Sequence, residues 1–152
     1  MSRKSAGILA YKYVEKQLLV LLAHPGGPYW KYKDNGAWTI PKGEYENEDS
    51  LAAAKREFSE ELGQEIDGSF IQLDVITTRA GKQITAFAVE ADLDVSSITS
   101  NLCVVEYPYK SGRYIKIPEI DRAGWFTIED AFLKLSKSQV PLLYSLLDIL
   151  NN

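Results

Sequence analysis

Three glutamates, Glu57, Glu60 and Glu61, are spaced so that they share one face of a helix. Each residue of an α-helix turns by about 100°, so positions i, i+3 and i+4 are neighbours. Like charges at this spacing repel one another by a few tenths of a kcal/mol on an isolated helix. A divalent cation held by oxygen atoms would offset this repulsion. Because the set contains no histidine or cysteine, it favours Mg²⁺ or Mn²⁺, with Ca²⁺ as an alternative, over zinc.

Such a carboxylate set predicts chemistry on phosphates. Mg²⁺ keeps several waters and typically binds a few carboxylates together with substrate phosphates. The predicted reaction is hydrolysis of a phosphoanhydride, in which metal ions neutralise phosphate charge and a carboxylate orients or deprotonates a water. Arg56 lies beside the acidic face and is placed to hold one carboxylate through a bidentate pair. The alternative for the three glutamates is a solvated acidic helix face without a ligand.

The helix that must carry these glutamates is expected over residues 48–62. Three alanines at 52–54 and the charged residues after them are good helix formers. Asp49 or Ser50 is expected to cap its start, and Gly63 to end it. A separate apolar stripe predicts that the helix packs against a core. The stripe consists of Leu51, Ala54, Phe58 and Leu62.

The rest of the chain predicts a mixed sheet with helices. Apolar or alternating segments predict strands at 5–13, 17–23, 37–40, 66–79, 83–91, 102–109 and 120–126. The second of these is continuously apolar at 18–22, as in a strand buried on both faces. Helices are expected from Thr127 and over 139–150, whereas 24–36 and 42–47 are expected to be loops. This order predicts an α/β (α+β) fold, a layered sandwich of helices and a mixed central sheet.

Composition limits the classes of protein and partner. At 152 residues and 45% hydrophobic, the chain suits a single domain, 1–152, with a proper core. A net charge of -4 argues against an extended nucleic-acid surface or an anionic membrane as partner, while a small phosphorylated ligand remains open. Cys103 is the only cysteine, which fits a reducing cytoplasm. No segment resembles a signal peptide or membrane span, so we expect a soluble cytoplasmic protein.

Residues 43–64, from Gly43 to Gln64, closely resemble the Nudix box. That signature runs glycine, five residues, glutamate, seven residues, Arg-Glu, an apolar residue, any residue, Glu-Glu, any residue, glycine and an apolar residue. The matching residues are Gly43, Glu48, Arg56, Glu57, Phe58, Glu60, Glu61 and Gly63. The chain departs from it twice, since only four residues separate Gly43 from Glu48 and Gln64 takes the final apolar position. The first departure leaves open whether Glu48 or Asp49 is the upstream acid.

The resemblance implies a Nudix-like α/β/α sandwich and a Nudix-type pyrophosphohydrolase that depends on Mg²⁺ or Mn²⁺. Its substrate would be a small nucleoside diphosphate derivative: a nucleoside triphosphate, an NDP-sugar, a dinucleoside polyphosphate or a capped RNA end. Glu60 and Glu61 would be the principal metal ligands, and Glu57, oriented by Arg56, would be a third metal ligand or the catalytic base that activates the water. The alternative is a non-catalytic Nudix-fold domain that binds nucleotides or regulates. The sequence does not predict the oligomeric state.

Further residues are candidates for binding the substrate. Their side chains or backbone could meet phosphates or stack on a base, a contact worth ~1–3 kcal/mol. They are Tyr29, Trp30, Lys42 and Gly43. Glu119 is a further candidate, because it lies where some members of the resembled family supply a late acidic residue to the metal site. For the two aromatic residues the alternative is a loop pinned to the core by its own rings. Trp38 is expected in the core, His24 at a turn, and Cys103 as an inert buried thiol.

Overall fold

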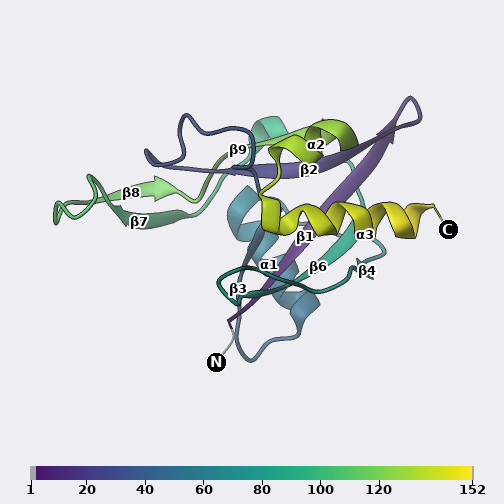
Figure 1. The fold of residues 1–152 in the computed structure, drawn as a ribbon, viewed down its shortest axis with the longest axis horizontal. Coiled ribbons are helices and arrows are strands. Elements are labelled where there is room, and N and C mark those ends of the chain that lie inside the picture. The colour runs from purple at the N-terminus through teal and green to yellow at the C-terminus, as the bar shows by residue number, and fades with distance from the viewer. Residues whose placement is uncertain (1–2, 152) are drawn as a thin grey trace.

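The computed structural model describes residues 3–151 (Figure 1). The strands are β1 (Lys4–Val14), β2 (Gln17–Pro25), β3 (Lys42–Glu44), β4 (Ile71–Gln72), β5 (Ile76–Thr77), β6 (Gln83–Glu90), β7 (Leu102–Glu106), β8 (Tyr114–Pro118) and β9 (Ile120–Thr127). The α-helices are α1 (Ser50–Leu62), α2 (Ile128–Lys134) and α3 (Val140–Leu150), and short 3₁₀ turns occur at Val95–Ser97 and Lys137–Gln139. Within residues 3–151, no helix is long and apolar enough to cross a membrane.

A mixed sheet forms the centre of the molecule. Its strand order is β4-β6-β1-β2-β9, with β3 also paired to β1 and β5 to β6. The β1–β6 pair is parallel, whereas β1–β2, β1–β3 and β2–β9 are antiparallel. Strands β7 and β8 form a separate two-stranded hairpin that projects from the body (Figure 1).

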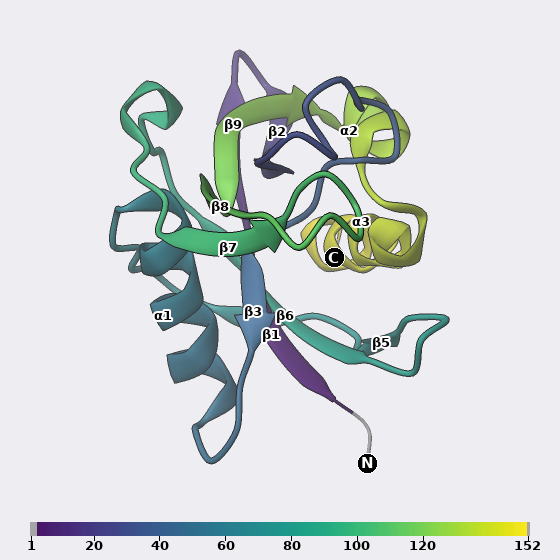
Figure 2. The same cartoon turned by 90° about the vertical axis from the view of Figure 1, so that its left-hand side faces the viewer.

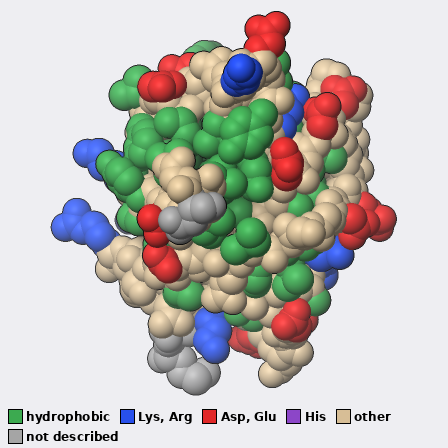
Figure 3. All heavy atoms as spheres, turned by 90° about the vertical axis from the view of Figure 1, so that its right-hand side faces the viewer, with side chains coloured by type: hydrophobic (Ala, Val, Ile, Leu, Met, Phe, Trp, Pro, Cys, Tyr) green, Lys and Arg blue, Asp and Glu red, His purple; other side chains and the backbone are tan. Residues whose placement is uncertain are grey.

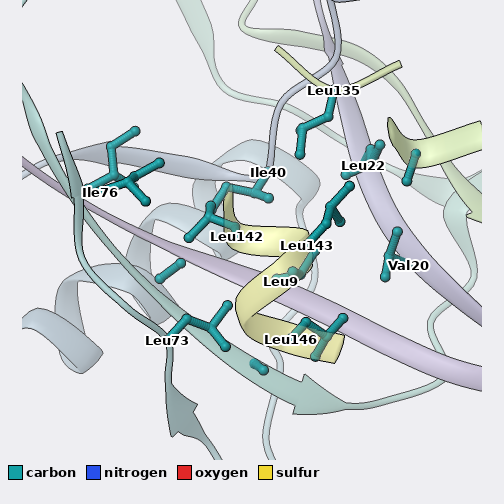
Figure 4. Close-up of a cluster of buried hydrophobic side chains, with 14 of the residues drawn as sticks. Leu9, Val20, Leu22, Ile40, Leu73, Ile76, Leu135, Leu142, Leu143 and Leu146 are labelled. Atoms are coloured by element: carbon teal, nitrogen blue, oxygen red, sulfur yellow. The ribbon is translucent and has the colours of Figure 1, made fainter. Parts of the chain in front are cut away.

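Helices cover both faces of the sheet, with α1 on one side and α2 and α3 on the other (Figure 2). Because successive side chains of a strand point to opposite faces, Ile8 joins the cluster under α1 and Leu9 the cluster under α3. Leu21 and Leu22 divide in the same way, which explains the continuously apolar second strand. Figure 4 shows Leu9 and Leu22 beside Leu142, Leu143 and Leu146 of α3. The predicted α/β/α sandwich with a mixed sheet is confirmed.

Several strand predictions need correction. Segment 66–79 forms only the two-residue strands β4 and β5, because the register against β6 shifts by one residue between Gln72 and Ile76 and interrupts the pairing. Residues 37–40 make isolated bridges rather than a strand, at Trp38 and Thr39. Conversely, 42–44 pairs with β1 as β3, and 114–118 is a strand that the sequence reading left out. The predicted helices at the C-terminal end are confirmed as α2 and α3.

Apolar side chains gather on the face of the molecule that carries the C-terminal end (Figure 3). Exposed apolar residues of α2, α3 and the end of β1 include Leu133, Tyr144 and Tyr13. The β7–β8 hairpin projects at the opposite end of the molecule (Figure 1).

Candidate functional site

Helix α1 is fixed at both ends and along one side. Asp49, rather than Ser50, is the N-cap, and its side chain accepts a hydrogen bond from the Ala52 N–H at 3.1 Å. Gly63 ends the helix in the left-handed conformation, with φ of 71°, which glycine adopts without strain. The buried side is formed by Ala53, Ala54, Phe58 and Leu62, while Leu51 of the predicted stripe is half-buried. This packing sets which glutamates turn toward the sheet.

Glu57 and Glu61 are the two carboxylates that α1 turns toward β3, and they are only 9% and 6% exposed. The Lys42 backbone N–H donates to Glu61 Oε1 at 3.1 Å. Gly43 lies against Glu57 so closely that a Cβ at this position would overlap the carboxylate. Any other residue at position 43 would therefore displace either the backbone of β3 or the Glu57 side chain.

Arg56 connects three acidic residues into one network. Its Nη2 donates to Glu48 Oε1 at 2.7 Å, and its Nε contacts both Glu48 oxygens at 3.2 Å. Its Nη1 donates to Glu57 Oε1 at 3.0 Å and to Glu60 Oε1 at 3.2 Å. The upstream acid left open by the sequence is thus Glu48, since Asp49 serves as the cap. The bidentate partner of Arg56 is Glu48, and its contact with Glu57 is a single hydrogen bond.

The buried carboxylates hold less negative charge than exposed ones would. Burial, with Glu119 and Glu57 nearby, raises the pKa of Glu61 to about 9, although the Lys42 N–H opposes the shift. Burial also raises the pKa of Glu57, against the effect of Arg56. Arg56 instead lowers the pKa of Glu48 through its hydrogen bonds. Burial lowers the pKa of Lys42, so its ammonium group is also poorly solvated.

These groups fit a hard divalent cation in their chemistry. Glu57 and Glu61 are desolvated carboxylates crowded by Glu119, and a cation would stabilise their ionised forms. Glu60 is exposed and turned to Arg56, and residues 3–151 hold no ready-made group of three acidic, histidine or cysteine ligands. The structure thus buries Glu57 and Glu61 and leaves Glu60 exposed, linked to Glu57 through Arg56 Nη1.

A cavity of about 270 Å³ opens beside Glu61. One wall is the loop after β2, the other is the inner face of the β7–β8 hairpin, and Lys42, Glu61 and Glu119 lie at one end. The lining residues are Pro25, Gly26, Tyr29, Trp30, Thr39, Ile40, Lys42, Glu61, Cys103, Val105, Ile117, Glu119 and Ile120. The two walls touch, because the Tyr29 hydroxyl donates to the Glu106 carbonyl and the Tyr29 and Tyr107 rings lie 5.5 Å apart.

Most of the predicted binding residues meet at this cavity. Tyr29, Trp30, Lys42 and Glu119 line it, whereas Gly43 lies beyond it against Glu57. Tyr29 lines the cavity and also pins its loop, to the hairpin rather than to the core.

The sequence also predicted the surroundings of three residues outside the binding set. Trp38 is 5% exposed, which confirms its place in the core. The prediction for His24 was wrong, because the residue lies within β2 and is completely buried. Cys103 is half-buried and lines the cavity instead of lying in the interior, and burial raises the pKa of its thiol.

Sequence reasoning missed two contributions to the cavity. Val105 and Ile117 of the hairpin supply its apolar wall. The Ser-Gly turn at 111–112, followed by the alternating segment 114–118, is a hairpin signal that would have revealed them. Gln139 fixes the floor, accepting from the Ile40 N–H at 2.9 Å and donating to Thr39 Oγ1 at 2.8 Å. No local sequence signal marks that contact.

Solved structures with the same fold include nucleotide-binding proteins. The NUDIX domain of Shewanella oneidensis NrtR, complexed with ADP ribose, aligns with a TM-score of 0.70 at 14% identity, covering 99% of this chain and 89% of that one. A binary complex of Caenorhabditis elegans Ap4A hydrolase aligns at 0.67 and 19% identity, covering 98% of each chain. A NUDIX hydrolase described as putative, from Listeria monocytogenes, aligns at 0.64 and 21% identity, covering 97% and 94%.

At these identities the likeness shows the fold alone. A search of curated proteins finds no significant match to this sequence. The family described as the NUDIX domain, however, matches residues 1–146. That span contains α1 with its glutamates, the Gly43 approach to Glu57 and the whole cavity. The chain therefore belongs to the Nudix family.

Proposed function

We propose that this protein hydrolyses a phosphoanhydride bond in a nucleoside diphosphate-linked substrate, with Mg²⁺ or Mn²⁺ as cofactor. The observation that carries the proposal is the pair of buried carboxylates, Glu57 and Glu61, at the end of an apolar cavity. Burying two acids costs free energy unless something compensates their charge. A site that accepts this cost is typical of catalysis and metal binding rather than of a solvated helix face.

Each residue has a proposed role. Glu57, Glu60 and Glu61 would hold the metal, with Glu60 exchanging its contact with Arg56 for the cation. When bound, the metal supplies positive charge to the phosphates. Glu57 is the proposed base for the attacking water, because its raised pKa favours proton uptake and Arg56 fixes one of its oxygens. Lys42 adjoins Glu61 and is placed to meet a phosphate.

The cavity supports a substrate with an aromatic moiety. Its walls carry the Tyr29 and Trp30 side chains and, opposite them, Val105 and Ile117. Aromatic side chains stack on bases of any sequence, so these walls suit a nucleobase without selecting one. NDP-sugars, dinucleoside polyphosphates and nucleoside triphosphates all satisfy this requirement. The solved relatives, one complexed with ADP ribose and one named an Ap4A hydrolase, fall in the same broad class.

The test is a substrate panel with a matched variant. Nucleoside triphosphates, NDP-sugars, dinucleoside polyphosphates and triphosphorylated RNA are incubated with Mg²⁺ or Mn²⁺, and release of phosphate and nucleotide is measured. Glu61→Gln keeps the size of the side chain and an acceptor for the Lys42 N–H. We expect release from one class, lost in the variant. Equal release by both proteins would refute the assignment of this face to catalysis.

The second candidate is a Nudix-fold domain that binds nucleotides without turnover. The observation in its favour is that Glu60 is exposed and paired with Arg56, whereas Glu57 and Glu61 are buried. It predicts binding of a panel member, seen as a thermal shift, with no product under any metal condition. Binding with silence across the whole panel would select this candidate.

A further inference from the structure

His24, the only histidine of the chain, lies inside the protein beside the cavity. It precedes Pro25 at the end of β2 and is 0% exposed. Its ring packs edge-on against Trp38, with ring centroids 5.1 Å apart and an angle of 67° between the planes. Nothing in the proposed reaction uses this residue, so its burial needs another explanation.

Both ring nitrogens of His24 face hydrogen-bond acceptors. Nδ1 lies 2.9 Å from Asp121 Oδ1, and Nε2 lies 2.7 Å from the Lys33 carbonyl oxygen. A neutral imidazole has one N–H, so it would set a bare nitrogen against one of these oxygens. An imidazolium donates to both. The carboxylate of Asp121 supplies the opposite charge that a buried cation requires.

The two partners of His24 lie next to two different segments that line the cavity. Lys33 closes the turn that carries Trp30, because its N–H donates to the Trp30 carbonyl at 2.9 Å. Asp121 lies two residues after Glu119, whose carbonyl accepts from the Gly26 N–H at 2.9 Å. The β2–β9 register also shifts between His24 and Pro25, so Asp121 lies at the irregularity, between the paired residues Ile120 and Arg122.

We propose that His24 is a buried imidazolium and a positioning residue, which fixes the Trp30 turn relative to the start of β9, beside Glu119. The doubly protonated ring adds two side-chain hydrogen bonds at the point where the β2–β9 register shifts. Without this bridge, the Trp30 turn and the start of β9 lose their shared contact, and the cavity-lining residues that they carry lose their fixed positions.

The other charged groups around the ring are largely paired. Arg122 Nη1 lies 3.6 Å from the same Asp121 oxygen, and its guanidinium lies 5.3 Å from the centre of the Trp38 ring. Asp34 accepts from Trp38 Nε1 at 2.8 Å and pairs with Lys134 of α2. Asp121 Oδ1 therefore faces two cationic groups. In a variant without the Arg122 guanidinium, this oxygen should still pair with His24.

Nuclear magnetic resonance of the ring tests the charge. Because the chain has one histidine, ¹⁵N-labelled histidine gives one pair of ring signals without assignment. We expect both nitrogens to carry protons at neutral pH. Asp121→Asn, which removes the carboxylate, should show one bare ring nitrogen, whereas Arg122→Gln should show both protons, as in wild type. A folded wild type with one bare ring nitrogen at neutral pH would overturn the imidazolium.

Hydrogen exchange tests the positioning role. His24→Phe keeps a flat ring but donates to neither partner, and His24→Gln can donate to one. Exchange over 26–36 should be fastest in the Phe variant, intermediate in the Gln variant and slowest in wild type, with 76–82 unchanged as the control segment. Unchanged exchange over 26–36 in both variants would overturn the positioning role. Neither this test nor the ring spectrum depends on the proposed function.

A binding measurement tests whether His24 affects the cavity. Of the three tests, only this one rests on the proposed function. If the fraction of molecules with ordered walls falls to about a tenth, apparent affinity falls about ten-fold. We expect that loss for ADP with Mg²⁺ in His24→Phe, and a smaller one in His24→Gln. Unchanged ADP affinity in a variant with faster exchange would overturn the link to the cavity. A wild type that does not bind ADP would count against the proposed function, while the ring spectrum and exchange would still decide the role of His24.

Discussion

Replacing Glu61 by glutamine should remove activity and at the same time stabilise the metal-free protein. The Glu61 side chain is 6% exposed, and burial with the neighbouring Glu119 raises its pKa from 4.5 to about 9. Between these two values the folded protein binds more protons than the unfolded chain. The free energy of unfolding therefore falls as the pH rises through this range. Because glutamine does not titrate, the free energy of unfolding of the variant does not fall with pH for this reason.

The size of the effect follows from the raised pKa. A pH of about 7 lies about 2.5 units above the ordinary pKa of a glutamate. At about 1.4 kcal/mol per unit, the wild type loses at most about 3.4 kcal/mol of its free energy of unfolding over this range. Relaxation of the site and entry of water reduce it, and we expect about 1–3 kcal/mol. For a chain of this size that corresponds to an increase in melting temperature of about 2–12 °C. The glutamine oxygen can still accept from the Lys42 N–H, so that hydrogen bond is kept.

The assay is denaturation at a series of pH values in the presence of a chelator. The difference between Glu61→Gln and wild type should be smallest at about pH 4.5 and should grow toward neutral pH. Glu60→Gln is the control, because Glu60 is exposed and its contact with Arg56 contributes at most about 1 kcal/mol. Adding Mg²⁺ or Mn²⁺ should stabilise wild type more than Glu61→Gln. A variant less stable than wild type at neutral pH, or a difference independent of pH, would refute the reasoning.

Three further substitutions test the site. Gly43→Ala should lower kcat about 100-fold by displacing the carboxylate beneath it, with unchanged circular dichroism, whereas Gly81→Ala, at an open turn, should keep full activity. Arg56→Lys cannot reproduce the guanidinium fork, so kcat should fall about 10–100-fold in steady-state assays; a loss under two-fold would contradict this. Tyr29→Phe loses its bond to the Glu106 carbonyl and should weaken ADP binding about three-fold in titration calorimetry; unchanged affinity would show that the bond is dispensable.

The fold was predictable where the apolar pattern is strong and local. The alternation of β1, the continuous apolar segment of β2 and the stripe of α1 each indicate which faces are buried. The pattern fails where pairing depends on distant partners. Segment 66–79 reads as one strand, yet only four of its residues pair with β6, as β4 and β5. Pairing of β3 with β1 likewise depends on a partner far away in the sequence.

The site was predictable as a set of residue types and not as an arrangement. Helical spacing places Glu57, Glu60 and Glu61 on one face, but packing of α1 decides that Glu60 is exposed and the other two buried. His24 gives the clearest failure. A lone histidine before Pro25 reads as a turn residue, because nothing near it in the sequence reveals Asp121 as its partner.

The shortened loop before α1 illustrates how a departure in spacing is absorbed. Asn47 adopts a left-handed conformation, with φ of 56°, which asparagine tolerates better than most residues. After this turn, Asp49 caps the helix and Glu48 reaches Arg56 at 2.7 Å. The loop thus loses a residue without separating the upstream acid from its arginine. Because the network around Glu57 is complete despite the deletion, the shorter loop does not favour a domain that has lost catalysis.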